Sequence, residues 1–225
     1  MATPLALRHV DGSHLGLAVA ILDERLLLAG PAGPSVAPGL APSEGLLDAG
    51  GAGPVETYTR ATYPYADVVL SAVEVALALA TEVALATLVS ADPAAEAIRP
   101  PAHQRTWGPP ALRAETASTL CILATSLNAH HAAHLTTCAW CAQRPEDSPA
   151  FRRSALATQI ARGLIDARLD PLTVSGCSID CALDLAHLAL TMACALTSRP
   201  PEALLRALSA RVAAARSVPP PAPTP

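Results

Sequence analysis

The feature that most constrains this chain is a recurring pattern of long apolar segments separated by short stretches rich in Pro and Gly. Within the segments, Leu, Val and Ala recur every three or four residues, which places them on one face of an α-helix. Only 3% of the residues are aromatic although 51% are hydrophobic, so a core must be built from aliphatic side chains. The pattern predicts an all-α fold, an irregular antiparallel bundle of five or six helices.

Pro and Gly set the ends of most of the predicted helices. The predicted helices cover residues 13–29, 63–90, 111–142, 149–169, 178–198 and 201–216, and a short turn at 56–62 is an option before the second. The second helix is apolar over most of its surface, so we expect it to be central. We expect its polar residues to form a narrow solvated stripe: Asp67, Ser71, Glu74, Thr81 and Glu82.

The same pattern predicts the domain organisation. Residues 1–30 carry the first helix, and 31–55 are expected to form a flexible linker, because a Pro/Gly/Ala-rich stretch cannot bury enough apolar surface to offset chain ordering. Residues 56–217 are predicted to form the helical bundle domain, a size that one core can support. The Pro-rich tail at 218–225 is expected to be disordered.

The charge of the chain argues against nucleic-acid binding. The net charge is −4, and all 15 basic residues are Arg. The last predicted helix carries Arg206, Arg211 and Arg216, but three Arg are too few to attract a phosphate backbone. A protein partner is therefore favoured over a nucleic acid.

One segment, 68–89, is long and apolar enough to cross a bilayer. However, Glu74 and Glu82 lie inside it, and each costs about 2.5–3.5 kcal/mol near the middle of a membrane. We therefore expect a buried helix and no membrane span. The first apolar segment contains acidic residues and does not resemble a signal peptide. A cytoplasmic location with reduced thiols is expected.

Groups able to do chemistry gather in the predicted helix 111–142. Its apolar face continues in the same steps into imidazoles and thiols, so these are expected to extend the buried seam. The seam contains Leu112, Thr116, Leu120, Leu123 and Leu127, followed by His130 or His131, His134, Cys138 and Cys141. Either these side chains bind a metal, or they are ordinary core residues.

The residues His134, Cys138 and Cys141 form a His-x3-Cys-x2-Cys arrangement. Imidazole and thiolate are the ligands that tetrahedral zinc prefers. The string HLTTCAWC resembles the zinc-binding motif of zinc-containing anti-sigma factors. That resemblance implies zinc binding in a helical module that holds a sigma factor, which some members release when the thiols oxidise. The family motif lies near the start of a short domain, whereas residues 1–133 precede it here, so the resemblance implies the metal more than the partner.

A tetrahedral site needs a fourth ligand. The sequence offers Cys121, Cys177, Cys181 and His130. In an up-down-up bundle Cys141 and Cys177 lie about one helix length apart, roughly 30 Å at 1.5 Å per residue. His130 or His131 is therefore preferred. A redox pair at Cys138 and Cys141 is a further alternative, although Cys-x-x-Cys normally occurs in a βαβ context.

The remaining polar residues have simpler interpretations. Asp184 and His187 have the spacing of a carboxylate–His metal pair, but an exposed polar face, shared with Asp180 and Thr191, is preferred because acidic residues are seldom buried. Cys121 and Cys194 are interpreted as core residues.

The chain has no Gly-rich phosphate loop, no nucleophile elbow and no paired catalytic carboxylates. These absences favour a non-enzymatic interaction or regulatory protein with a structural or redox-sensitive zinc site. Its protein partner would bind through the helix 201–216 or through a mobile helix 13–29. The alternatives are a metal-free bundle with inert core cysteines, or a small-ligand-binding protein or enzyme that uses His130, His131 and His134 in a bundle cavity.

Overall fold

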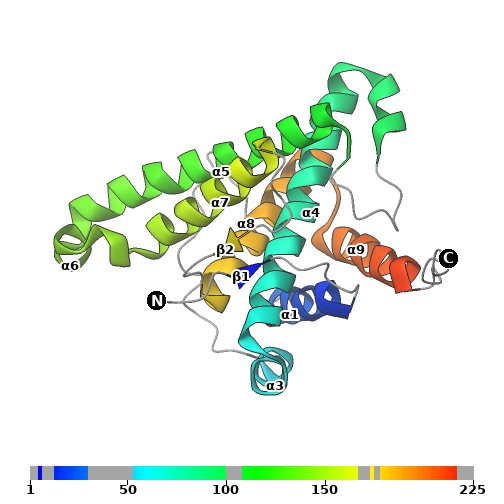
Figure 1. Cartoon of the computed structure of the whole chain (residues 1–225). Coiled ribbons are helices and arrows are strands. Elements are labelled where there is room, and N and C mark those ends of the chain that lie inside the picture. The colour runs from blue at the N-terminus through cyan, green and yellow to red at the C-terminus, as the bar shows by residue number, and fades with distance from the viewer. Residues whose placement is uncertain are drawn as a thin grey trace, which may run out of the picture.

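The computed structural model describes residues 5–6, 13–29, 53–99, 108–166, 173–174 and 178–216. Helices make up almost all of this part of the chain, which confirms the all-α prediction (Figure 1). Two short strands, β1 (Leu5–Ala6) and β2 (Thr173–Val174), pair antiparallel with Leu5 opposite Val174.

All six predicted helices occur in the described residues, together with two short α-helices and two 3-10 helices. In chain order the elements are α1 (Ser13–Ala29), α3 (Pro54–Thr62), α4 (Tyr65–Ala91), the 3-10 helix η1 (Pro93–Ile98), α5 (Pro110–Thr137), α6 (Ala139–Gln143), the 3-10 helix η2 (Pro145–Asp147), α7 (Pro149–Ile165), α8 (Ile179–Thr197) and α9 (Pro201–Arg216). Four of the α-helices begin at Pro, whose fixed φ and missing N–H suit a first turn. The bounds of α1 and α9 are as predicted.

Helix α4 is central, as its composition predicts, and it packs against α8, α5 and α1 (Figure 1). Its polar stripe is not solvated, so that part of the prediction is wrong. Ser71 is fully buried, and its Oγ accepts a hydrogen bond of 3.0 Å from the backbone N–H of Ala18 in α1. Thr81 is buried too, and its hydroxyl donates to the carbonyl of Leu77 at 2.8 Å. Local hydrogen bonds of this kind allow hydroxyls to lie inside a core.

Helices α4 and α8 are each long and apolar enough to cross a membrane, by length and composition alone. In this structure 83% and 61% of their most apolar windows are buried inside the protein. Such burial is also what the core helices of a globular bundle show. The absence of a membrane span stays a prediction.

Helix α1 is a packed part of the core and not the mobile arm that the sequence suggested. Ala18, Ile21 and Leu22 are fully buried, and the helix contacts α4 and α9. Its Glu24 carboxylate accepts hydrogen bonds from the first N–H groups of α3, at 2.8 Å from Val55 and 2.9 Å from Glu56. Helix α3 therefore begins inside the last residues of the predicted linker. The rest of that linker and the predicted tail lie outside the described residues.

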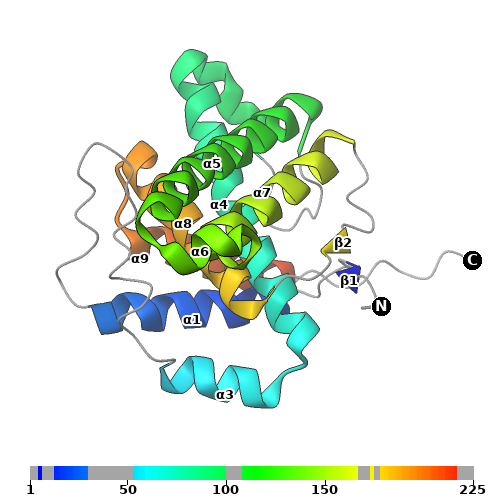
Figure 2. The same ribbon diagram turned by 90° about the vertical axis from the view of Figure 1, so that its left-hand side faces the viewer.

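Helices α5 and α7 lie side by side as an antiparallel pair joined through α6 and η2 (Figures 1 and 2). In α7, Ile160 and Leu164 face the core as predicted, but Phe151 and Ala155 are exposed and contradict the prediction. The inward face instead carries small residues at steps of three and four: Ala150, Ser154, Ala157 and Ala161. The Ser154 hydroxyl donates to the carbonyl of Ala124 in α5 at 3.1 Å. We call these four positions the small-residue seam of α7; they allow a close approach to α5, while Leu156, Ile160 and Leu164 are the large buried side chains of the helix.

Candidate metal centre

The candidate site lies where the chain turns from α5 to α7. We call residues 128–147, which include the end of α5, α6 and η2, the tip. Helix α5 ends at Thr137, so the continuous helix predicted to residue 142 is wrong. Cys138 has an extended backbone (φ −109°, ψ 103°), and α6 starts after it. The hydroxyls of Thr136 and Thr137 donate to the carbonyls of Ala133 and His134 at 2.7 and 3.0 Å. Such side-chain bonds compete with helix continuation, and β-branched residues are poor helix formers.

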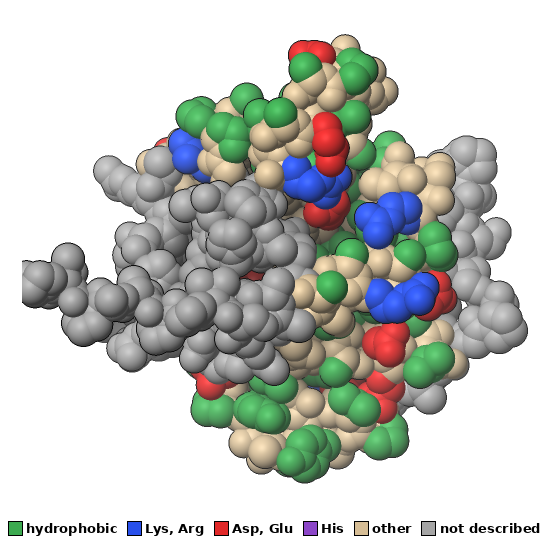
Figure 3. Space-filling model, turned by 90° about the vertical axis from the view of Figure 1, so that its right-hand side faces the viewer, with side chains coloured by type: hydrophobic (Ala, Val, Ile, Leu, Met, Phe, Trp, Pro, Cys, Tyr) green, Lys and Arg blue, Asp and Glu red, His purple; other side chains and the backbone are tan. Residues whose placement is uncertain are grey.

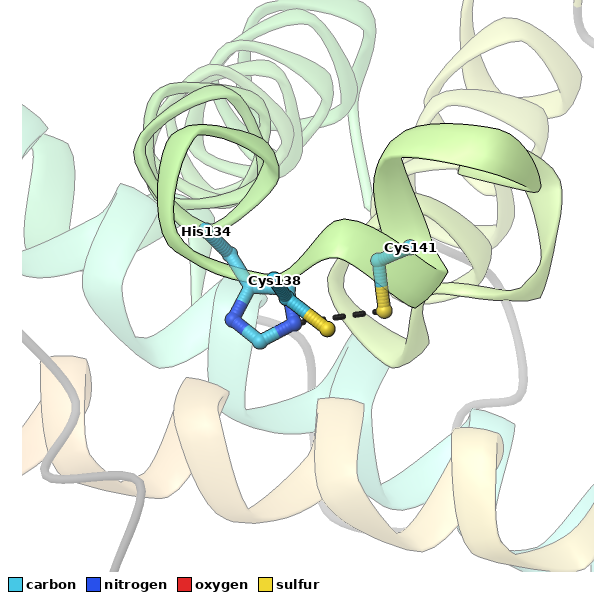
Figure 4. Close-up of side chains that lie close together, drawn as sticks. All are labelled: His134, Cys138 and Cys141. Atoms are coloured by element: carbon cyan, nitrogen blue, oxygen red, sulfur yellow. Dashed lines mark hydrogen bonds between the residues drawn. The ribbon is translucent and has the colours of Figure 1, made fainter.

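This break brings the three predicted ligands together (Figure 4). In a continuous helix, Cys141 would lie about 10.5 Å along the axis from His134, at 1.5 Å per residue. In the structure, His134 Nε2 is 3.3 Å from Cys141 Sγ. The ligand atoms of His134, Cys138 and Cys141 all lie within 4.8 Å of one another. The end of the helix is therefore what creates the site.

These distances suit a tetrahedral ion. With Zn–S bonds of about 2.3 Å and Zn–N bonds of about 2.0–2.1 Å, tetrahedral angles hold sulfur and nitrogen about 3.6 Å apart and two sulfurs about 3.8 Å apart. The three side chains come from the last turn of α5, from the break and from α6, and their heteroatoms face one another (Figure 4). The donor set therefore fits a soft or borderline metal ion with small adjustments of the side chains.

The site is less buried than the sequence predicts. The seam of α5 is buried as far as Leu127, but His134, Cys138 and Cys141 are only partly buried. Among the residues described at 128–147, none is buried as a whole, and Cys141 is the most deeply buried of the three ligands. The reason is visible in Figure 1, where the α5–α7 pair extends beyond α4 and α8 toward α6. The helical spacing of the seam continues along α5, but toward α6 the helices α4 and α8 no longer cover it.

Local electrostatics favour metal binding at Cys138. The backbone N–H and then the thiol of Cys141, with a smaller contribution from the backbone of Trp140, stabilise the Cys138 thiolate and lower its pKa from the ordinary value. A thiolate is the form that binds a metal. By contrast, burial and the nearby Glu202 carboxylate raise the pKa of Cys194 to about 11. Cys194 packs against the core, as predicted.

The other predicted ligands do not join this cluster in the described residues. His130 is not part of the group, so its role as the fourth ligand stays a prediction. The ring of His131 packs against Phe151 with centroids 5.5 Å apart, and its Nδ1 is buried without a hydrogen-bond partner. Cys181 is buried at the start of α8, and Cys177 lies outside the described residues. Cys121 is exposed on α5, so its interpretation as a core residue is wrong.

A second polar cluster was missed by the sequence analysis. We call it the ion-pair network, and it contains Arg25, Glu56, Arg60, Arg153, Asp180 and Asp184. Arg25 donates to both carboxylate oxygens of Glu56 at 3.0 Å and to Asp184 at 3.3 Å. Arg60 pairs with Glu56 and Asp180, and Arg153 pairs with Asp184. The network thereby joins α1, α3, α7 and α8.

The network corrects the prediction that Asp184 and His187 belong to an exposed face. Both are buried. Burial opposes ionisation of Glu56, but hydrogen bonds from Arg25 and Arg60 outweigh it and lower its pKa. Burial, and then the positive charge of Arg25, lower the pKa of His187. The signal that could have identified the network is a charge inside an apolar stretch of helix, such as Asp184 between Leu183 and Leu185, because a buried charge requires a partner.

Each carboxylate of the network is bound to at least one guanidinium, although Arg153 Nε is buried without a hydrogen-bond partner. The six residues provide three charges of each sign, so the network neutralises itself. It therefore holds helices together and does not resemble a metal site.

Comparison with known proteins adds no relative. No protein-family model, no curated protein and no solved structure matches the chain significantly. What the protein does must therefore be argued from the geometry of the tip.

Proposed function

We propose that this chain is a non-enzymatic helical regulatory protein that binds zinc through His134, Cys138 and Cys141 and engages a protein partner. One observation carries the proposal: three ligand atoms of the right kinds lie within 4.8 Å of one another at a helix break. The proposal includes a cytoplasmic location, where thiols stay reduced.

The donor chemistry favours zinc over other metals. Two thiolates and an imidazole suit a tetrahedral zinc ion, whereas Mg²⁺ and Ca²⁺ prefer oxygen ligands. The ligands lie before, at and after the break between α5 and α6. A bound ion would therefore fix the angle between these helices, which is a structural role.

The distribution of aromatic side chains supports an interaction role. The described aromatic residues, Tyr58, Tyr63, Tyr65, Trp140 and Phe151, are each at least 39% exposed, while the core is aliphatic. Exposed aromatics are enriched at the energetic centres of protein interfaces. On the face shown in Figure 3, the described Arg side chains are scattered among acidic, hydrophobic and other residues and form no continuous basic surface. This mixture favours a protein partner over a nucleic acid.

The test is metal analysis of untagged protein purified under reducing conditions. Wild-type protein is expected to hold about one zinc per chain, with cobalt substitution giving thiolate-to-metal charge-transfer absorption. The double variant Cys138→Ser/Cys141→Ser is expected to lose both signals. Cys121→Ser, an exposed cysteine on the same helix, is the matched control and should keep them. Zinc-free wild-type protein that takes up no added zinc would refute the metal site, and retention of zinc by the double variant would refute its ligands.

A further inference from the structure

We propose that the bound metal, and not a hydrophobic core, holds the tip in its folded form, so that α6 and Trp140 are ordered when the ion is present and released when it is removed. This inference rests on the proposed zinc site and adds a conformational role to it.

The first observation is the end of apolar burial along the α5–α7 pair. In α5 the buried residues occur from Leu112 to Leu127. After Leu127 the next residue that is buried as a whole along the described chain is Ser148, followed by Ala150 in α7. Burial of apolar surface is the dominant stabilising term in folding. The side chains of the tip are at most partly buried, as His131 is against Phe151, so this term is weaker there and the tip needs another source of order.

The second observation is the isolation of α6. The helix is five residues long and packs mainly against α5 and η2, its neighbours in sequence. A helix of this length is not stable by itself. Trp140 is 63% exposed. The guanidinium of Arg144 lies over its ring at 5.4 Å from the centroid, so this contact joins two residues only four positions apart. None of these contacts ties α6 to the core.

The third observation is the order of the ligands along the chain. His134 belongs to the last turn of α5, Cys138 forms the break and Cys141 lies in α6 (Figure 4). An ion bound to all three joins the two helices directly. The ion takes the Nε2 lone pair of His134 and the sulfur lone pairs of both cysteines, and each thiol releases its proton to solvent. The free energy of binding then becomes folding free energy of the segment that supplies the ligands.

The consequence is a metal-dependent surface. Trp140 lies between Cys138 and Cys141 in sequence, so its orientation follows the order of α6. The core around α4 and α8 does not include any of the three ligands and keeps its packing. Metal loss is therefore expected to open the tip and leave the remaining fold intact.

Hydrogen–deuterium exchange of the full-length chain tests this inference. Wild-type protein is compared with and without a chelator, at free zinc about 100 times the dissociation constant in the loaded sample. Amides of residues 134–144 are expected to exchange up to about 100-fold more slowly with zinc, because a ligand at that excess lowers the open population by this factor. Peptides from α4 and α8 are expected to be unchanged. Cys121→Ser should behave as wild type, and Cys138→Ser/Cys141→Ser should show a fast-exchanging tip in both conditions.

The outcomes separate the two proposals. If about one zinc binds per chain but the tip exchanges equally with and without it, the inference is overturned while the zinc site stands. If zinc slows exchange equally in α4, α8 and the tip, the inference is also overturned, because the ion then stabilises the whole fold. If no zinc binds, both proposals fail.

Discussion

The ion-pair network and the tip both gather polar side chains from several helices, yet they differ in burial and in chemistry. In the network, guanidinium and carboxylate groups neutralise one another, and the Glu56 side chain is only 2% exposed. In the tip, His134, Cys138 and Cys141 are partly buried, and their heteroatoms face one another without a carboxylate or guanidinium in the group. In the network, opposite charges satisfy one another, whereas the three donor atoms in the tip have the geometry of a metal site.

This difference teaches how to separate structural from ligand-binding polar clusters. Buried charges persist when opposite charges satisfy them, and removing one partner leaves an uncompensated charge. Soft donors that converge at a partly exposed helix end can instead be satisfied by a metal. The next three predictions test whether the network is held by charge pairing, in order of expected size.

The largest effect is expected from Glu56→Gln. The change leaves Arg25 and Arg60 without their shared carboxylate, so the free energy of unfolding should fall by about 3 kcal/mol, the lower end of the range for breaking a buried pair, because both guanidiniums are partly exposed. Urea denaturation measures it. Zinc-free Cys138→Ser/Cys141→Ser protein, compared with zinc-free wild type, is the control and should unfold at nearly the same urea concentration. A loss below about 1 kcal/mol for Glu56→Gln would remove the distinction between the two regions.

A smaller effect is expected from His187→Gln as the pH falls. The folded pKa of His187 lies below its ordinary value of 6.5 because of burial and of Arg25, with Asp184 acting in the opposite direction. The folded state therefore binds fewer protons than the unfolded state, and stability present above pH 6.5 is lost as the pH falls toward the folded pKa. The variant should lose less stability on acidification, by up to about 1.4 kcal/mol per pH unit below 6.5.

Urea denaturation of both proteins between pH 7 and pH 5 gives the two slopes. The carboxylates of the network are the same in both proteins, so the difference isolates His187. Equal slopes would show that protonation of His187 does not contribute to the loss of unfolding free energy at low pH.

The smallest effect is expected from Asp180→Asn. Asp180 pairs with Arg60, and this guanidinium lowers its pKa, but its side chain is 65% exposed. An exposed pair contributes about 0.2–1 kcal/mol, so the loss in unfolding free energy should lie in that range and shrink in high salt. A cost comparable to that of Glu56→Gln would mean that pairing alone, and not depth of burial, sets the strength of the network.

Much of the fold could be predicted from the sequence because each helix carries its own boundary signals. Ser178, predicted as the cap of α8, accepts a hydrogen bond from the backbone N–H of Cys181 at 3.1 Å. Which face of a helix is covered could not be predicted in every case. Ser71 is predicted to be exposed but is buried, because α1 covers it. Phe151 is predicted to be buried but is exposed, because the small-residue seam of α7 faces inward in its place.

The candidate site shows the same division. The identities and spacing of His134, Cys138 and Cys141 are readable in the sequence, but their convergence depends on a helix break that periodicity does not reveal. The ion-pair network was hidden for a related reason. Arg25 and Asp184 are far apart along the chain and meet through the packing of α1 against α8.

The sequence by itself determined the helices, most of their ends and the donor atoms available, because these follow from local periodicity, capping and side-chain chemistry. The tertiary structure alone decided which polar groups are buried in pairs and which three donors face one another. Burial and convergence depend on contacts between residues distant along the chain, and a local pattern does not specify these contacts.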